Sequence, residues 1–245
     1  MGKKPKRKNF SFQIFLPDEI MPFTAFKLLE IPTLHAGISI LGGLPKAGKT
    51  HFFAWLSAQA VKQGKPVVFH TTETLHSYFD KLLRAYLEKE KIQLATYKEK
   101  FFYLEFAKPY PYSQLLPELR KKIQKPFLLL VENLRDALEE VSKLPARNYD
   151  SLNPVLRKLN SIALENQVCV FTAHHMGEKA REKLAQEWQQ ILNSTAIASA
   201  VTAVYLLEEV SLLNQKFKVL KYAIGRFSPE VKTPILYFSG KIKKI

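Results

Sequence analysis

The chain has 245 residues, 47% of them hydrophobic, which suits a single α/β domain with a substantial buried core. Its 37 basic and 22 acidic residues give a net charge of +15, which favours a polyanionic partner such as nucleic acid; lysine enrichment for solubility or heat tolerance is the alternative. The single cysteine, Cys169, excludes an intramolecular disulfide, and no apolar stretch approaches the roughly 20 residues of a membrane span. We therefore expect a cytoplasmic protein with no membrane partner.

The N-terminal segment is first basic and then interrupted by prolines. Residues 3–8, KKPKRK, are too polar to pack, so we expect either an arm that contacts phosphate backbones or a solvated tail. Prolines punctuate the apolar residues of 10–33, which is typical of an irregular strap. We expect the first core strand to follow this strap.

Apolar runs and helical patterns alternate after the strap, which predicts an α/β fold with a mostly parallel central sheet flanked by crossover helices. We expect strands at 38–41, 67–71, 101–106, 127–131 and 168–173. We expect helices near 50–63, 75–90, 113–124 and 152–166. Short polar links join three later strand-like runs, which predicts an antiparallel C-terminal extension formed by AVYLLEEV, FKVLKYAIG and TPILYF.

A glycine-rich segment, GLPKAGKT, follows the first predicted core strand and precedes a predicted helix. It matches the phosphate-binding pattern G-x-x-x-x-G-K-[ST], so we expect a nucleotide to be held by Gly43, Leu44, Pro45, Lys46, Ala47, Gly48, Lys49, Thr50 and His51. Backbone N–H groups and the helix N-terminus would face the phosphate oxygens. Lys49 is expected to reach the β- and γ-phosphates, and Thr50 to bind Mg²⁺. The alternative is a chance glycine-rich turn.

Two glutamates follow predicted strands, at the edge where open α/β sheets bind their ligands. Glu73 comes after the strand at 67–71 and could orient a water molecule toward the γ-phosphate; alternatively, it complements the dipole of the next helix. Glu132 comes after the strand at 127–131 and is expected to hold the metal, or else to cap the following loop. Asp136 is a second candidate for the metal-side acid.

Several segments together resemble the RecA-fold ATPases: the glycine-rich loop, TETLH with Arg84 after it, VENL, FTAHH and the late GRFSPE. The resemblance is to the plasmid RepA-like hexameric helicases and to the ATPase domain of DnaB-type replicative helicases, and it spans roughly residues 32–238. It implies a RecA-like ATPase domain at 32–240. The arm and strap at 1–31 precede this domain, and a basic tail at 241–245 follows it.

The resemblance also implies roles for individual residues. Glu73 corresponds to the water-activating base. His175, or its neighbour His174, stands where the family has a γ-phosphate sensor. Arg226 stands where a neighbouring subunit inserts an arginine finger, although a surface pair with Glu230 is the alternative.

The chain departs from the family pattern at three places. Glu132 stands where Asp is usual on the metal side, and Ile224 stands where a lysine usually precedes the finger arginine. Residues 192–195 read LNST where the helicases often have RGSS. These departures weaken the expectation of vigorous turnover.

The sequence therefore predicts an ATPase with Mg²⁺ that assembles into a ring, such as a hexamer, or a filament and acts on DNA, especially single-stranded DNA, as a helicase or translocase. The resemblance places DNA against the links at 135–150 and 176–193, each of which carries basic residues. A protein loader could substitute for the separate N-terminal domain of replicative helicases. The alternatives are a nucleotide-switched scaffold acting on a protein partner and a small-molecule or nucleotide kinase.

Overall fold

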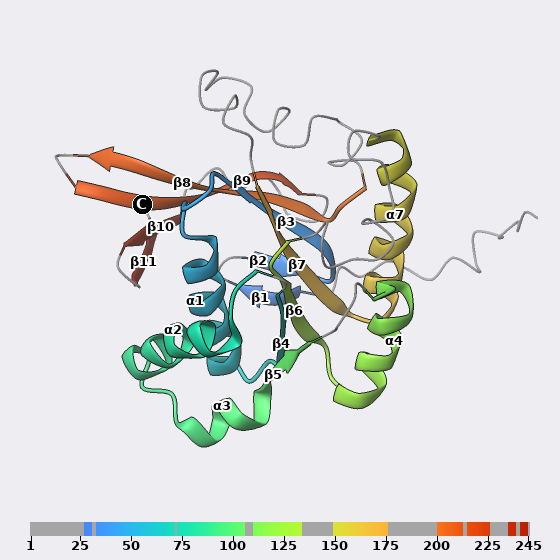
Figure 1. The fold of residues 1–245 in the computed structure, drawn as a ribbon, viewed down its shortest axis with the longest axis horizontal. Helices are drawn as coiled ribbons and strands as arrows, with labels where there is room; N and C mark the ends of the chain where they lie inside the picture. The colour runs from blue at the N-terminus through green and yellow to red at the C-terminus, as the bar shows by residue number, and fades with distance from the viewer. Residues whose placement is uncertain are drawn as a thin grey trace, which may run out of the picture.

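A computed structural model of the chain describes residues 27–30, 33–71, 73–105, 110–133, 149–175, 200–212, 215–225, 235–238 and 241–244. Within these ranges one nine-stranded sheet forms the centre of the molecule (Figure 1). Its strands are, in spatial order, β11 (Lys241–Lys244), β10 (Ile235–Phe238), β9 (Gln215–Gly225), β8 (Ala203–Leu212), β3 (Gly37–Gly43), β7 (Val168–His175), β6 (Phe127–Val131), β4 (Val67–His70) and β5 (Phe101–Leu104).

The strands from β8 to β5 in this order run parallel to their neighbours, whereas β9, β10 and β11 add to the β8 edge in antiparallel pairs. The central strands β3, β4 and β6 are buried along their whole length, as continuous apolar strands covered on both faces must be. This arrangement confirms the predicted α/β fold with a mostly parallel sheet and an antiparallel C-terminal extension.

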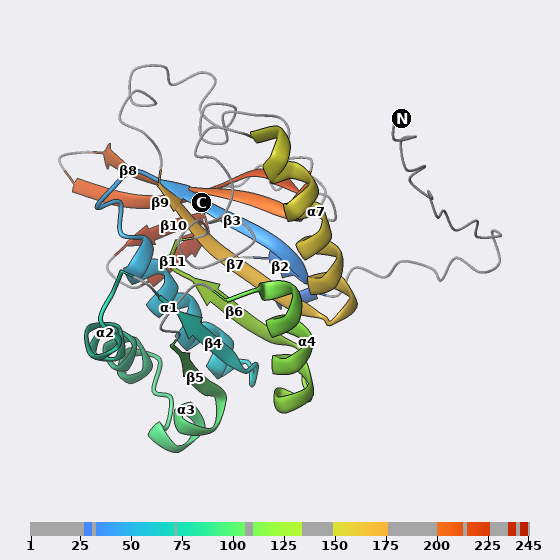
Figure 2. The ribbon, with the colours of Figure 1, turned by 45° about the vertical axis from the view of Figure 1, so that its right-hand side comes forward.

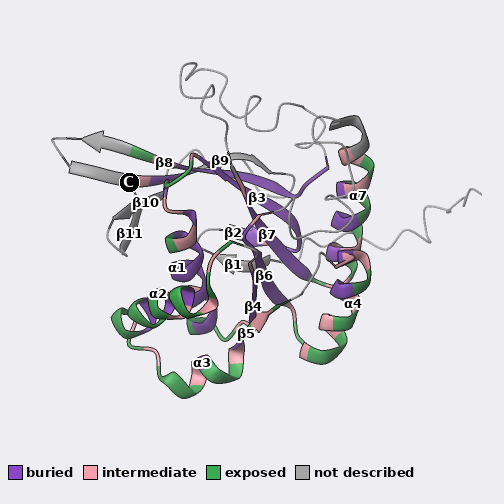
Figure 3. Ribbon diagram, viewed as in Figure 1, coloured by how far each residue is buried: buried purple, intermediate pink, exposed green. Residues whose placement is uncertain are grey.

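Helices cover both faces of the sheet (Figures 1 and 2). One layer consists of α1 (Lys49–Lys62), α2 (His76–Lys89) and α3 (Leu94–Lys100), and the other contains α4 (Tyr112–Ile123) and α7 (Tyr149–Glu165). Each layer buries its own hydrophobic core against the sheet, and the outward faces of the helices are exposed (Figure 3). On α7, for example, Leu156, Leu159 and Ala163 recur at helical spacing and are buried. None of the helices in the described ranges is long and apolar enough to cross a membrane.

Three short elements lie outside the expected pattern. Helix α3 has only seven residues and buries Tyr97 alone, so it has no hydrophobic periodicity that a sequence could display. Lys241–Lys244, which we expected to be part of a basic tail, instead pairs with β10 as β11. Lysines are tolerated there because β11 is an edge strand. Within the segment expected to be an irregular strap, β1 (Lys27–Glu30) pairs with β2 (Thr33–His35) as a separate two-stranded sheet.

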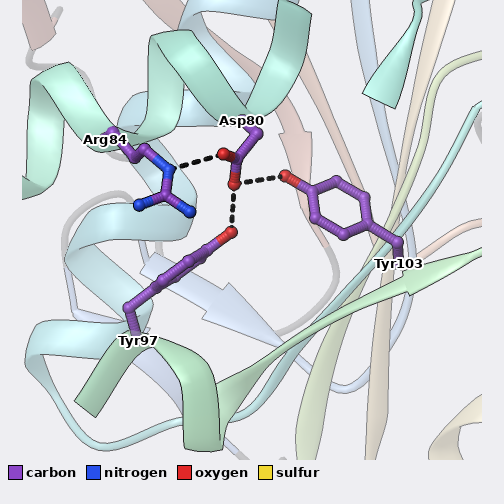
Figure 4. Close-up of polar contacts among 4 residues, drawn as sticks. All are labelled: Asp80, Arg84, Tyr97 and Tyr103. Atoms are coloured by element: carbon purple, nitrogen blue, oxygen red, sulfur yellow. Dashed lines mark hydrogen bonds and ion pairs between the residues drawn. The ribbon is translucent and has the colours of Figure 1, made fainter. Parts of the chain in front are cut away.

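A polar cluster joins α2 to α3 and β5 (Figure 4). Asp80 on α2 accepts hydrogen bonds from Arg84 Nε at 2.5 Å, from Tyr103 Oη at 3.1 Å and from Tyr97 Oη. Burial raises the pKa of Asp80, but the hydrogen bonds from Arg84 and the two tyrosines outweigh it, so the net pKa lies below 3.8. The ionised carboxylate therefore anchors the helix that begins shortly after Glu73.

Replacing Asp80 by asparagine is expected to lower the free energy of unfolding at pH 7 by about 1 to 2 kcal/mol, because one partly exposed charged acceptor is lost. A carboxyl group whose folded pKa is depressed stabilises the fold above its unfolded pKa, near 3.8, and loses that effect as pH falls through the folded value. The difference between wild type and variant should therefore shrink below pH 3.8 in denaturant titrations. An equal difference at pH 3 and pH 7 would contradict a role for the ionised form.

Candidate active site

The carboxyl ends of β3, β4, β6 and β7 meet at one edge of the parallel sheet. The glycine-rich loop follows β3, Thr71 and Glu73 follow β4, and Glu132 follows β6. Parallel strands deliver the loops after them to the same edge, which is where open α/β sheets bind ligands. Residues far apart in the sequence are therefore brought together at one place.

The loop between β3 and α1 begins with a tight turn. The Ala47 N–H donates to Leu44 O at 3.1 Å, with Pro45 and Lys46 at the two central positions. Lys46 has a φ of 64°, and proline followed by a residue of positive φ is the pattern of a type II turn. Pro45 and the Lys46 side chain are exposed on the outside of this turn.

The two glycines of the loop meet different constraints. A Cβ on Gly43 would lie 3.0 Å from Leu207 O on β8 and 3.6 Å from Lys49 Cδ, so a side chain there would crowd the backbone of the neighbouring strand. Gly48 has a φ of 96° at the N-cap of α1, which glycine adopts without strain. The helix thus starts with its unpaired N–H groups at the mouth of the loop.

Lys49 is the first residue of α1 and lies buried beneath the loop. Its ammonium donates to Gly43 O at 2.9 Å and to Leu44 O at 3.0 Å. Burial lowers the pKa of Lys49 to about 8, although the negative charges of Glu73 and Glu132 act in the opposite direction. The cation is therefore poorly solvated and close to two acids, and an anionic ligand would improve its surroundings.

Glu132 connects the loop after β3 with the loop after β4. Its Oε1 accepts a hydrogen bond from the Thr50 hydroxyl at 2.5 Å, and its Oε2 accepts one from the Thr71 hydroxyl at 2.6 Å. Its backbone N–H donates to His70 O at 3.0 Å, which continues the pairing of β6 with β4. The side chain is 5% exposed. The longer glutamate therefore spans the distance to Thr50 although the related ATPases usually have aspartate.

Glu73 is held by residues from both neighbouring loops. Its Oε1 accepts a hydrogen bond from Asn133 Nδ2 at 2.7 Å, and its backbone N–H donates to the Thr71 hydroxyl at 3.1 Å. The Thr74 N–H donates to the same hydroxyl at 2.8 Å. Asn133 has a φ of 137°, a strained conformation of the kind that concentrates at functional sites. Glu73 and Glu132 are thus coupled through Thr71.

A buried neutral histidine lies behind this pair of acids. His70 Nδ1 forms a hydrogen bond with the Tyr112 hydroxyl on α4. Burial, and then the charge of His76, lower the pKa of His70 to about 4, so the ring is neutral at physiological pH. It supports the backbone under Glu132 without adding charge to the site.

The remaining predicted site residues are described only in part. The His175 main chain pairs with Gly43 at the end of β7, which puts it beside the glycine-rich loop, and the half-buried His174 pairs with Gly42. Arg226 and Asp136 lie outside the described residues. The proposed sensor and arginine-finger roles therefore stay predictions.

Comparisons with known proteins support the fold alone. No protein-family model matches the chain, and no curated protein matches it. Among solved structures, the ATPase domain of a DnaB-type helicase is similar with a TM-score of 0.65 and 11% sequence identity, over 86% of this chain and 85% of that chain. The fold is RecA-like. This finding confirms the resemblance that the sequence motifs indicated.

Two polar residues of this RecA-like site were not among those predicted from the sequence. Thr71 bridges Glu132 to the backbone of Glu73, and Asn133 donates to the Glu73 carboxylate. Both directly follow or adjoin a strand end, in HTTET and VEN, and this position was the available signal. Pattern reasoning selected the acids and passed over the uncharged residues that orient them.

The RecA-like site offers donors suited to Mg²⁺. The Thr50 hydroxyl and the Glu132 carboxylate are hard oxygen ligands that already contact each other. In the described part of the chain, no group of three or more His, Cys, Asp and Glu side chains could hold a metal by itself. Mg²⁺ usually takes only one or two protein ligands beside substrate phosphates and water, so this donor set fits.

Proposed function

We propose that the chain is a Mg²⁺-dependent ATPase. The observation that carries the proposal is the contact between Thr50, at the start of α1, and Glu132, at the end of β6. It joins a glycine-rich loop of the phosphate-binding pattern to a buried acid at the adjacent strand end. The choice of adenosine triphosphate follows from the similarity of sequence and fold to RecA-type ATPases.

Each residue of the site has a task in this proposal. The loop Gly43–Thr50 and the N-terminus of α1 bind the phosphates, and Lys49 leaves its backbone acceptors for the β- and γ-phosphate oxygens. Thr50 and Glu132 would hold Mg²⁺, which supplies positive charge to the triphosphate. Glu73 orients and deprotonates the attacking water, while Thr71 and Asn133 hold Glu73 in place.

The further proposal is that the ATPase acts on single-stranded DNA as an oligomeric helicase or translocase. It is supported by the net charge of +15 and by the RecA-like fold shared with the helicase ATPase domain. The links at 135–150 and 176–193 are the proposed DNA contacts, and Arg226 is proposed to act in a neighbouring subunit. Phosphate contacts from several subunits would add together.

ATP turnover with and without single-stranded DNA tests this proposal. We expect Mg²⁺-dependent hydrolysis that DNA stimulates, with stimulation that falls steeply as salt rises. Lys49→Ala protein is the background control. Native mass measurement with ATP and an oligonucleotide should show an oligomer with both ligands bound. Hydrolysis indifferent to DNA at every salt concentration would remove the motor and favour the nucleotide-switched scaffold; absence of nucleotide binding would remove the ATPase itself.

A further inference from the structure

The β8–β9 hairpin runs beside the loop that joins β3 to α1 (Figures 1 and 2). The contact is close, because a Cβ on Gly43 would lie 3.0 Å from Leu207 O on β8. Two residues farther along β8, Glu209 lies directly opposite Lys218 in the antiparallel register with β9. The sheet therefore fixes a charged cross-strand pair next to the phosphate-binding loop.

Lys218 reaches the loop itself. Its Cε lies 3.7 Å from the position that a Cβ on Gly48 would occupy, and its Nζ lies 2.6 Å from Glu209 Oε2. Its charge also reaches His51, whose pKa is lowered by burial and then by Lys218. The side chain is 25% exposed, so the ammonium borders both solvent and the N-terminus of α1. No motif in the sequence marks this lysine.

The site has a direction that tells which phosphate Lys218 would meet. Glu73 and Glu132 follow β4 and β6, on one side of β3, whereas Lys218 belongs to β9, on the other side. The reacting γ-phosphate must face the acids. The α-phosphate end of the chain therefore lies toward the hairpin, where the loop and first turn of α1 cradle the α- and β-phosphates.

We propose that Lys218 binds the α-phosphate of the nucleotide, leaving Glu209 when the nucleotide enters. This inference depends on the proposed nucleotide binding and adds a residue to that site. Exchange of partner is easy, because an exposed ion pair contributes little and a phosphate is a stronger acceptor for an ammonium. Glu209 then acts as a competitor that holds Lys218 ready beside the loop while the site has no nucleotide.

The chain contains a matched control pair. Lys62, in the last turn of the same helix α1, forms an ion pair with Glu90 at 2.7 Å. It lies at the far end of α1 from the glycine-rich loop. Lys62→Ala therefore removes the same charge and the same kind of surface pair without touching the site.

The experiment measures affinities of wild type, Lys218→Ala, Lys218→Arg, Glu209→Gln and Lys62→Ala for Mg²⁺–ATP, Mg²⁺–ADP and inorganic tripolyphosphate. Lys218→Ala should weaken all three ligands about tenfold, as expected when one charge-assisted hydrogen bond is lost. Lys218→Arg should stay within about threefold of wild type, because the charge and donors are kept. Glu209→Gln should tighten binding about two- to threefold, because the competing carboxylate is gone. Lys62→Ala should match wild type.

The possible failures are distinguishable. If wild type binds no nucleotide, the proposed function fails. If wild type binds and Lys218→Ala binds equally well, this inference alone is wrong. Weaker ATP and ADP binding with unchanged tripolyphosphate binding would assign Lys218 to the nucleoside and overturn the phosphate contact. Weaker binding by Glu209→Gln as well, with lower thermal stability in both variants, would show that the pair is only structural.

Discussion

Replacing Glu73 by glutamine is expected to lower ATP turnover by about 10²- to 10⁴-fold while leaving ATP affinity within a few-fold of wild type. Glutamine retains the side-chain oxygen that accepts the hydrogen bond from Asn133, so the local geometry survives. It cannot accept the proton of the attacking water. Binding depends mainly on the loop and Lys49, which the substitution leaves unchanged.

Single-turnover hydrolysis and equilibrium binding of ATP measure the two effects separately. Glu88→Gln is the control, since Glu88 is an exposed residue near the C-terminal end of α2 and has the same change of charge. Its turnover should equal that of wild type. Full turnover by the Glu73→Gln protein would show that another group activates the water, and loss of binding would show that Glu73 serves mainly to organise the loop.

Replacing Gly37 by alanine is expected to lower the free energy of unfolding by about 3 to 5 kcal/mol, from backbone strain and broken buried hydrogen bonds together. Gly37 begins β3 with a φ of 103°, and its Cβ would lie 2.0 Å from Thr202 Oγ1 and 2.7 Å from Asn160 Oδ1. Those two groups form a buried hydrogen bond of 2.9 Å, and Asn160 Oδ1 also accepts the Ile38 N–H at 2.7 Å. The methyl group would break this connection between α7, β3 and the start of β8.

Gly64→Ala provides the matched control for this substitution. Gly64 also has a positive φ, of 72°, but a Cβ there would meet no atom within 4 Å. The loss should therefore be limited to about 1 kcal/mol of backbone strain. Denaturant titrations of the two variants separate strain from collision. Equal losses in both would mean that the Thr202 and Asn160 side chains move aside at no cost.

Local sequence signals were sufficient for most elements of the fold. The predicted strand at 127–131 coincides with β6, and the helix expected at 75–90 differs from α2 by one residue at each end. Both segments have strong patterns, a continuous apolar run in the first and helical periodicity in the second. The segment LATYKEK has neither, since α3 packs only Tyr97, and its conformation depends on contacts with α1 and β5.

The candidate site divides in the same way. The spacing G-x-x-x-x-G-K-[ST] and the acids after apolar strands were readable, because backbone curvature and strand-end position depend on residues close in the sequence. The roles of Thr71 and Asn133 were not, since each depends on which loop lies beside it. Lys218 is the extreme case, because only the register between β8 and β9 sets it next to Gly48.

By itself, the sequence determined that this chain builds a RecA-like sheet with a phosphate-binding loop at the end of its first core strand. Hydrophobic periodicity and glycine spacing are local properties, and local properties are written in consecutive residues. Only the tertiary structure decided that Glu132 would reach Thr50, that Asn133 would hold Glu73, and that β9 would set a lysine beside the loop. Those contacts join residues from separate strands, and strand order and register, which the sheet acquires only on folding, bring them within hydrogen-bonding distance.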